Sequence, residues 1–403
     1  MTQRRVPRWS QLRPLLQGPP RTPGASARRL QRAASIDDLR EQARRRVPRA
    51  VFDYTDGGAG CEVSLRRSRE AFDRVEFAPS TLRDVSSVDT STTLLGGPAA
   101  MPLVLAPTGF TRMMHHEGEV GVARAAARAG VPYALSTMGT TSVEALAAGA
   151  PEGRRWFQLY LWRDRAASTE LVHRAAAAGY EALVLTVDTP VGGLRLRDVR
   201  NGMTIPPRLT ARTVLDGARH PSWWVNLLTT EPLEFASLRF FSGTVSELVA
   251  HVFDPTATLA DLRWLREQWA GPLVVKGIVT VDDALASVDA GADALVVSNH
   301  GGRQLDRAAT PLEVLPDIVR AVGGRAEVYV DGGVLSGADV AAAVGLGARA
   351  ALVGRAYLYG LMAGGEAGVD RALEILRREL LTTMQLVGVT AVGELAKDRV
   401  RLR

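Results

Sequence analysis

An α/β fold with a (β/α)8 TIM barrel is predicted by three observations. Short apolar runs alternate with Ala-rich amphipathic segments from residue 101 onward, the pattern of a parallel sheet with crossover helices. Eight such runs occur, the number that closes this barrel. The chain has 403 residues and 46% hydrophobic composition, enough for a core of that size. An open doubly wound sheet would share the alternation, but its usual G-x-G-x-x-G turn is missing here.

The residues before the barrel are predicted to form a basic arm, 1–34, followed by a helix. The first fifty residues hold 13 arginines against three acidic residues, a balance of +10, whereas the whole chain carries +6. The body is therefore mildly acidic, and nucleic acid is not an expected partner. The arm is interpreted as a solvated or partner-draping extension, or as a contact with anionic lipid. Ser35 is expected to cap the helix, with Asp37 and Asp38 in its first turn and a loop carrying Tyr54 after it.

The barrel domain is expected to span residues 35–390, with a C-terminal tail at 391–403. Its predicted strands, in chain order, are MPLVLAPT (101–108), YALST (133–137), WFQLYL (156–161), ALVLTVD (182–188), LVVKGI (273–278), ALVVSNH (294–300), EVYVDGG (327–333) and AALVGR (350–355).

The connection between the fourth and fifth strands, about 199–258, is too long for an ordinary loop. We interpret it as a lid, an interface or a surface-binding insertion. Trp223, Trp224, Leu227 and Leu228 lie on one face of a short helix within it. This face is expected either to pack on the barrel or to contact a membrane.

Cysteine usage and hydropathy exclude several classes of protein. Cys61 is the single cysteine, so no internal disulfide is possible, and the spacings of a zinc site are missing. No signal-peptide core and no stretch of 18 uncharged apolar residues occurs. His115 and His116 are expected at a helix entry without other metal ligands. We therefore expect a cytoplasmic protein that neither spans a membrane nor binds a metal.

Polar residues end the predicted strands, and in a TIM barrel these ends meet in one mouth. Glycines in DGGVLSGADV and GRAYLYG, together with Arg355, predict a phosphate site beside the last two strands. Lys276 ends the fifth strand, where it would form a Schiff base or hold its charge against an anionic electron sink. Gln158 and Thr186 are placed to bond the amide edge of a pyrimidine-like ring.

A candidate base and an anion clamp follow the fourth and sixth strands. His300 and Asp188 would form a base with its orienting carboxylate if the barrel brings these strand ends together. Arg303 would pair bidentately with a carboxylate substrate, and Arg195 would close a second side of the same anion.

The motifs FQLY, LTVDTP, LVVKGI, SNHGGRQLD, VDGGV and AGGEAGV occur in this order between about residues 35 and 390. In this they resemble the FMN-dependent 2-hydroxy-acid dehydrogenase and oxidase family, which includes glycolate oxidase, L-lactate dehydrogenase and mandelate dehydrogenase. The resemblance implies that His300 deprotonates the substrate, that Asp188 is its partner, and that Lys276 stabilises negative charge on the reduced flavin. The substrate carboxylate would be bound by Arg303, Arg195, Tyr54 and Tyr160. FMN would be held by Pro107, Thr108, Gly109, Ser136, Gln158, Thr186, Ser298, Asp331, Gly332, Gly333, Gly354 and Arg355, beside Lys276.

Two positions depart from the family's pattern. Leu335 follows DGGV where many relatives have arginine, so one donor to the phosphate is missing. Arg355 and backbone amides must then supply more of the phosphate contacts, and weaker FMN binding is expected. Gly109 stands where many oxidases have alanine, which changes the room beside the flavin. Met138 and Gly192 occupy positions that shape the side-chain pocket, but neither fixes the size of the substrate.

The resemblance implies oxidation of a small L-2-hydroxy acid, with L-lactate to pyruvate favoured because the arm and the insertion resemble those of bacterial L-lactate dehydrogenases. The sequence has no NAD fingerprint and no heme domain, so electrons are expected to pass to oxygen or to a separate carrier. The basic arm and the insertion favour a quinone, with peripheral attachment to the inner face of the cell membrane. A larger or modified-peptide substrate and an FMN-binding scaffold stay open as alternatives. The family also implies a homo-oligomer, namely a tetramer.

Overall fold

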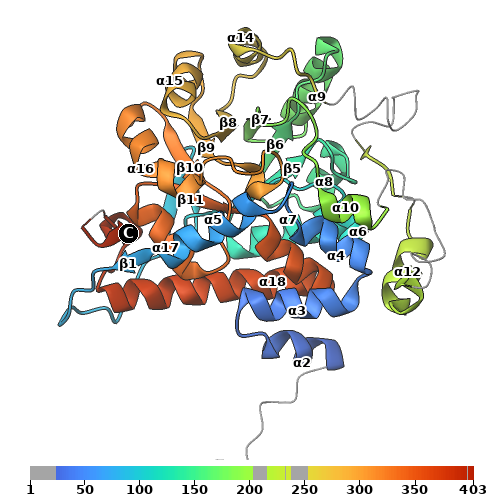
Figure 1. Ribbon diagram of the computed structural model, residues 1–403, viewed down its shortest axis with the longest axis horizontal. Coiled ribbons are helices and arrows are strands. Elements are labelled where there is room, and N and C mark those ends of the chain that lie inside the picture. The colour runs from blue at the N-terminus through green and yellow to red at the C-terminus, as the bar shows by residue number, and fades with distance from the viewer. Residues whose placement is uncertain (1–23, 203–215, 232, 237–252, 397) are drawn as a thin grey trace, which may run out of the picture.

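Eight parallel strands form a closed barrel in the computed structural model, which describes residues 24–202, 216–231, 233–236, 253–396 and 398–403. Neighbouring strands hydrogen-bond in the order β10, β11, β4, β5, β6, β7, β8, β9, and β9 pairs with β10 to close the ring. Helices surround the barrel, as Figure 1 shows. The predicted TIM barrel is confirmed, and the open doubly wound sheet is excluded because the ring has no free edge.

Each predicted strand is present, although some strands end up to three residues before the predicted end. The barrel strands are β4 (Leu103–Leu105), β5 (Tyr133–Ser136), β6 (Arg155–Leu159), β7 (Ala182–Thr186), β8 (Leu273–Ile278), β9 (Ala294–Val297), β10 (Glu327–Val330) and β11 (Ala350–Val353). Two antiparallel pairs lie outside the barrel: β1 (Val75–Phe77) with β12 (Val400–Leu402), and β2 (Thr92–Leu94) with β3 (Gly97–Ala99).

The described helices precede, alternate with and follow the strands. They are α2 (Ala25–Arg32), α3 (Ile36–Arg46), α4 (Arg49–Asp56), α5 (Val63–Asp73), α6 (Thr111–Met114), α7 (Gly118–Ala129), α8 (Val143–Gly149), α9 (Arg165–Ala177), α10 (Leu196–Arg200), α12 (Pro221–Thr229), α14 (Leu259–Gln268), α15 (Val281–Asp289), α16 (Pro311–Val322), α17 (Gly337–Gly345) and α18 (Arg355–Val387), with short 3-10 turns η2 (His300–Gly302) and η3 (Val392–Glu394).

The alternation of side chains along the strands explains why the strand ends converge. Val274 on β8 and Val296 on β9 belong to the core inside the barrel and are fully buried. Because residues two positions apart share one face of a strand, the next inward positions are Lys276 and Ser298. The same step leads on the other strands to Ala106, Ser136, Gln158, Thr186, Asp331 and Gly354. Residues far apart in the sequence therefore point into one mouth.

The segment that was expected to form one helix and a loop with Tyr54 forms two helices, α3 and α4. Ser35 caps α3 as predicted, and its capping box with Asp38 is complete. The residue before a proline favours extended backbone, so α3 stops at Val47, and α4 begins after Pro48. Tyr54 consequently lies in the last turn of helix α4, which corrects the expected loop.

Segments on both sides of the predicted barrel domain pack on it. Residues 1–23 lie outside the described residues, but α2 packs on α18, where Leu30 is 5% exposed and lies against Gly364. Figure 1 shows α2, α3 and α18 stacked in that order. At the other end β12 pairs with β1 and buries Val400. The arm from residue 24 onward and the expected tail are therefore parts of the folded body.

Helix α12 forms at the predicted tryptophan-bearing face of the insertion. The Trp223 indole N–H donates to the Met113 carbonyl at 2.8 Å, so this residue packs on the barrel body. Val225 and Leu228 are 58% and 73% exposed, so an apolar side of the helix faces outward. Leu228 was predicted on the same face as Trp223, but it is exposed, whereas Trp223 contacts Met113. The helix thus both packs and presents apolar surface.

Candidate active site

A cavity of about 670 Å³ occupies the mouth of the barrel. Seven arginines and one lysine line it against four carboxylates, which leaves an excess of positive charge. The cations are Arg40, Arg66, Arg69, Arg195, Arg197, Arg303, Arg355 and Lys276, and the carboxylates are Asp37, Asp56, Glu62 and Asp331. A concave site with such a balance attracts anions. Phosphate and carboxylate ligands therefore suit it.

Most of the predicted site residues line this cavity. They are Tyr54, Pro107, Thr108, Gly109, Ser136, Tyr160, Arg195, Lys276, His300, Arg303, Asp331, Gly332, Gly333, Gly354 and Arg355. Gln158 and Ser298 are buried beneath it and bond to the lining residues, and Asp188 contacts His300. Thr186 is not among the lining residues; it borders a neighbouring cavity of about 340 Å³.

The predicted pair of His300 and Asp188 is formed. His300 Nδ1 lies 2.9 Å from Asp188 Oδ1, which leaves Nε2 for the cavity. His300 has a φ of 59°, a left-handed backbone conformation that residues other than glycine rarely adopt. Gly301 and Gly302 continue it with φ of 60° and 73°, and Ser298 Oγ accepts the His300 N–H at 3.0 Å. The chain thus leaves β9 in a tight turn that directs the imidazole into the mouth.

The Asp188 carboxylate is ionised at neutral pH. Burial alone would raise the pKa of Asp188, but the proximity of His300 and Lys276 outweighs burial and holds it below its ordinary value. An ionised Asp188 can only accept a hydrogen bond, so the proton of a neutral His300 lies on Nδ1. Nε2 then carries a lone pair and can accept a proton. The same carboxylate would stabilise the imidazolium formed when Nε2 takes up a proton.

Lys276 is a buried cation below the cavity. Its ammonium bonds Ser298 Oγ at 2.8 Å and Asp331 Oδ2 at 2.9 Å. Burial would lower the pKa of Lys276, but Asp331 and Asp188 together raise it above the ordinary value. A Schiff base requires the neutral amine, so this environment favours the charge-holding alternative.

Two arginines enclose the ring of Tyr54. The guanidinium carbons of Arg303 and Arg195 lie 5.0 and 5.6 Å from the ring centre. Among the described residues, Arg303 donates through Nη1 to the carbonyls of Tyr54 and Gly57, and Nε and Nη2 have no partner there. Burial, with a smaller contribution from the charges of Arg195 and Arg355, lowers the pKa of Arg303 to about 10. A carboxylate in this clamp would relieve that repulsion.

Tyr160 completes this side of the mouth. Its ring packs edge-on against Phe253, with 5.4 Å between ring centres. Burial raises the pKa of Tyr160, mainly because no water can solvate a phenolate there, so the side chain stays a hydroxyl donor.

The floor of the cavity fits FMN. The Gln158 side chain is buried, its Oε1 accepts from Ser136 Oγ at 3.0 Å, and its amide nitrogen has no partner among the described residues. Asp331 Oδ1 is likewise buried and without a partner there. Gly332 and Gly333 both have φ of 90°, and a Cβ on Gly333 would lie 2.4 Å from a backbone carbonyl oxygen. The unpartnered polar atoms of Gln158 and Asp331 suit a polar ring, and the glycine backbone at Gly332 and Gly333 suits a phosphate.

The wall carrying Gly109 has no room for a larger residue. A Cβ added to Gly109 would lie 2.9 Å from Met138 Cβ, which is closer than such atoms approach. Met138 thus occupies the space that the side chain of an alanine at position 109 would need. Pro107 and Thr108 continue this wall, and Thr108 Oγ1 bonds the Tyr357 hydroxyl at 2.6 Å.

Arg355 begins helix α18 and points across the cavity. Its three nitrogens donate to the carbonyls of Thr55, Gly301 and Gly57 at 2.7 to 3.0 Å. Three of its five N–H groups are thereby used, and two are left for a phosphate. Leu335, on the neighbouring loop, lines the cavity without adding a donor from its side chain.

Sequence reasoning missed the residues that hold the mouth together. Asp56 accepts from Arg40 at 2.6 Å, from Arg197 at 2.9 Å and from the Tyr359 hydroxyl at 2.8 Å. Arg197 belongs to α10, two residues after Arg195, so this network ties the substrate clamp to α4 and α18. The Arg-Leu-Arg spacing in GLRLRD was the available signal, because residues two apart in a short helix face different partners.

Gln304 and Asn299 were also missed. Gln304 Nε2 donates to the carbonyls of Asp188 and Val191, and its Oε1 accepts from Gly193 N–H. Asn299 Oδ1 accepts from the N–H of Gly302 and so caps the turn that carries His300. Both amides fix loops by bonding to backbone groups, a role that composition does not reveal.

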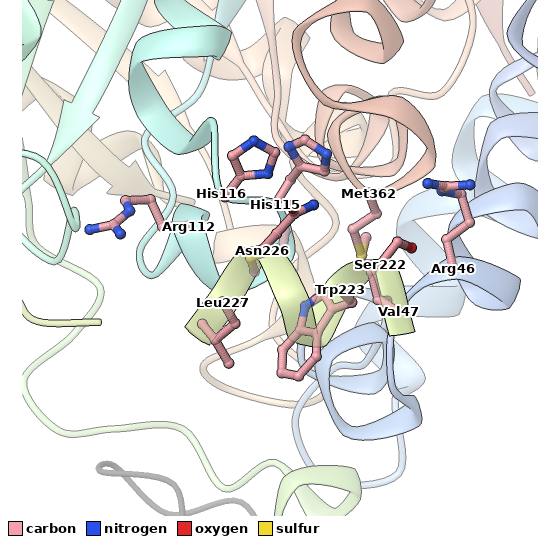
Figure 2. A pocket seen from close by; sticks show the side chains of 11 residues that line it. Arg46, Val47, Arg112, His115, His116, Ser222, Trp223, Asn226, Leu227 and Met362 are labelled. Atoms are coloured by element: carbon pink, nitrogen blue, oxygen red, sulfur yellow. The ribbon is translucent and has the colours of Figure 1, made fainter. Parts of the chain in front are cut away.

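His115 and His116 lie apart from the mouth, in a crevice that Trp223, Asn226 and Leu227 of α12 also line (Figure 2). Their ring centres are 4.4 Å apart, and the described residues offer no cluster of metal ligands. Burial, assisted by His116 and Arg46, lowers the pKa of His115 to about 4, although Glu117 lies 3.5 Å away.

His115 should make the fold sensitive to acid. Its folded pKa of about 4 lies below the ordinary 6.5, so the unfolded chain binds more protons in this window. The free energy of unfolding should therefore fall as pH drops from about 6.5 to about 4, by on the order of 3 kcal/mol. Urea unfolding across this range would measure it. His115→Gln should flatten the dependence, whereas His173→Gln, at an exposed site on α9, should not. An unchanged profile for His115→Gln would contradict this assignment.

The chain is similar to known proteins in sequence and in fold. The FMN-dependent dehydrogenase family matches residues 43–402. A provisionally named L-lactate dehydrogenase of Mycobacterium tuberculosis is 57% identical over 98% of this chain and 96% of its own. The L-lactate dehydrogenase of Caulobacter vibrioides is 45% identical over 90% and 96%. A crystal structure of (S)-mandelate dehydrogenase, described as a monotopic membrane protein, has a TM-score of 0.88 at 37% identity, covering 93% of this chain and 100% of that one.

The family match begins later than the predicted 35 and runs past the predicted 390, in agreement with the paired strand β12. Its extent, the identities and a cavity floor that suits a flavin all lead to one assignment. The chain belongs to the FMN-dependent dehydrogenase family, and FMN is its cofactor.

Proposed function

We propose that this protein oxidises a small L-2-hydroxy acid, L-lactate, to the 2-oxo acid pyruvate. The observation that supports it best is the single cavity in which His300, paired with Asp188, faces the clamp formed by Arg195, Tyr54 and Arg303. A base beside a carboxylate clamp suits a hydroxyl-bearing carbon next to a carboxylate. The lactate assignment draws on the relatives of this name, at 57% and 45% identity.

Oxidation of lactate removes two protons and two electrons from C2 and its hydroxyl. FMN, when bound, would supply the acceptor of the electron pair and of the proton that His300 does not take up. Arg303 and Arg195 hold the substrate carboxylate, so the hydroxyl-bearing carbon is presented in one orientation. His300 Nε2 takes up one proton from the substrate, and Asp188 stabilises the resulting imidazolium through Nδ1. Nε2 serves equally whether that proton comes from C2 or from the hydroxyl.

Other parts of the chain would hold FMN and exclude water from it. Lys276 places a positive charge below the cavity, where it would favour negative charge on the reduced ring. Gln158 would donate its free amide to the ring, and the backbone at Gly332, Gly333 and Gly354 would contact the phosphate. Tyr160 would donate its hydroxyl on the substrate side.

Anaerobic flavin reduction by L-lactate, D-lactate, glycolate and (S)-mandelate tests the substrate. We expect the highest kcat/KM with L-lactate, with pyruvate as its product. Mandelate is the second candidate because the (S)-mandelate dehydrogenase structure is so similar, and a higher kcat/KM with mandelate would replace lactate. A flavin that none of the four acids bleaches would refute the enzymatic proposal and leave an FMN-binding scaffold or a larger substrate.

We further propose a quinone as the electron acceptor and an anionic membrane surface as the place of reaction. No described helix is long and apolar enough to cross a bilayer. Residues 1–23 contain five arginines and no acidic residue, and α12 exposes Val225 and Leu228. A basic segment together with an exposed apolar face supports reversible attachment. The monotopic description of the mandelate dehydrogenase is in line with this proposal.

Cosedimentation with anionic vesicles tests the attachment, and reoxidation by a quinone analogue and by air-saturated buffer tests the acceptor. The deletion should remove residues 1–23 alone, because α2 belongs to the folded body. We expect this deletion and Leu228→Asp to weaken vesicle binding. Leu386→Asp, at a residue of equal exposure on α18, should not. Fast reoxidation by oxygen without vesicle binding would identify a soluble oxidase instead.

A further inference from the structure

The loops that would bind the phosphate of FMN carry few cationic side chains. Phosphates commonly bind at the loops after the last two strands of a TIM barrel, here Gly332–Leu335 and Gly354–Arg355. Arg355 is the one basic side chain in these two loops. A phosphate monoester carries a charge of about −1.5 to −2 at neutral pH. A second cation from elsewhere in the fold would complete its neutralisation.

The seven arginines of the cavity differ in whether a carboxylate already pairs with them. Arg40 and Arg197 bond Asp56, Arg69 bonds Asp339 at 2.9 Å, and Arg195 bonds Asp198 at 2.7 Å. Three have no carboxylate partner among the described residues: Arg303, Arg355 and Arg66. Arg303 belongs to the substrate clamp, so Arg355 and Arg66 are left for the phosphate.

Arg66 is a side chain with unused donors. It is exposed and bonds only backbone carbonyls, those of Cys61 at 3.0 Å and Glu62 at 3.4 Å, both through Nη1. The Glu62 carboxylate is occupied by Arg197 at 2.6 Å and by a backbone N–H. Nε and Nη2 of Arg66 together keep three N–H groups for a ligand.

Helix α5 carries Arg66 along the phosphate end of the cavity. At residue 65 the helix lies against Gly302, and three residues after Arg66 the Arg69 Nη1 donates to the Gly333 carbonyl at 2.8 Å. Residues three apart share a helix face, so Arg66 lies on the same side as Arg69, one turn nearer the loop of Gly301. Arg355 bonds the carbonyl of Gly301, whose Cα lies beside Gly332. Arg66 and Arg355 therefore line the same cavity near the glycine loop at Gly332 and Gly333.

We propose that Arg66, together with Arg355, supplies the second cation for the phosphate of FMN. Its ligand is the phosphate monoester, because Arg303 and Arg195 already serve the substrate carboxylate and Arg69, one turn further along α5, bonds the glycine loop at Gly333. The proposal rests on the FMN cofactor and not on the identity of the substrate acid.

Flavin binding to the full chain stripped of cofactor tests this proposal without turnover. Kd would be measured by quenching of flavin fluorescence, for FMN and for riboflavin, which lacks the phosphate. Arg66→Gln should weaken FMN binding on the order of 10-fold, the loss of one charge-assisted contact, which corresponds to about 1.4 kcal/mol. Riboflavin binding should not change. Arg66→Lys should retain part of the FMN affinity, because it keeps the charge.

Arg67→Gln is the matched control, since Arg67 is the next residue on α5, is equally exposed and does not line the cavity. Its FMN and riboflavin affinities should equal those of the parent. Added salt should narrow the difference between parent and Arg66→Gln. Unchanged FMN affinity in Arg66→Gln would overturn the proposal. Equal weakening of FMN and riboflavin would overturn it too, because it would show a structural rather than a phosphate-specific effect.

Discussion

His300→Ala is expected to lower the rate of flavin reduction by lactate at least 100-fold. A positioned general base contributes about 10² to 10⁴ in rate, and His300 is the imidazole that reaches the cavity with an orienting carboxylate behind it. Anaerobic stopped-flow mixing with lactate measures flavin reduction directly and separates it from reoxidation. FMN content should stay at the parent level because the imidazole is not assigned to the cofactor.

The control for this variant is His173→Ala on the exposed surface of α9. It should reduce its flavin at the parent rate. Asp188→Asn would lower the rate as well, since a neutral partner stabilises the imidazolium less. If His300→Ala reduced its flavin as fast as the parent, the proton would be taken by another group and the assignment would be wrong.

Arg303→Ala is expected to weaken substrate binding by roughly 30-fold to 1000-fold, the range for removing one partner of a buried charge pair. Arg303 is half-buried, its guanidinium bonds backbone carbonyls and is repelled by Arg195 and Arg355, and none of the described carboxylates forms an ion pair with it, so a substrate carboxylate would pair with it directly. The rate at saturation should fall too, because a substrate held at fewer points is aligned less well. Titration of the oxidised enzyme with pyruvate, followed by the flavin spectrum, gives the Kd.

Arg303→Lys keeps the charge and loses the planar fork, so its Kd should lie between those of parent and Arg303→Ala. Arg320→Ala, at an exposed position on α16, serves as the surface control and should bind pyruvate like the parent. Equal affinities in parent and Arg303→Ala would show that Arg195 alone binds the carboxylate.

The barrel and most of its mouth could be predicted because the relevant signals are local. Strand periodicity lies within four to six consecutive residues, and the two-residue alternation that buries Val296 also directs Ser298 inward. In the closed barrel, residues that follow different strands reach one place whatever lies between them. For this reason the sequence alone predicts the pairing of His300 with Asp188, 112 positions apart.

Other parts of the mouth depend on which distant side chain fills a given space. The pairing of Asp56 with Arg197 and Tyr359 joins three elements, and none of these residues carries a periodic signal. The same holds for the open donors of Arg66, which are defined by the absence of a nearby carboxylate rather than by any motif.

The sequence by itself determined the class of fold, the eight strands and the chemical groups at their ends, since these follow from patterning and strand order. Only the tertiary structure decided that α2 and β12 belong to the body, that Tyr54 lies in a helix, and that Lys276 is a paired cation. The places of α2 and β12 depend on contacts between residues more than 300 positions apart, and the last outcome depends on the pairing of Lys276 with Asp331, which follows another strand. Burial and charge at such contacts are properties of the packed molecule, because each depends on the whole set of neighbours that the fold brings together.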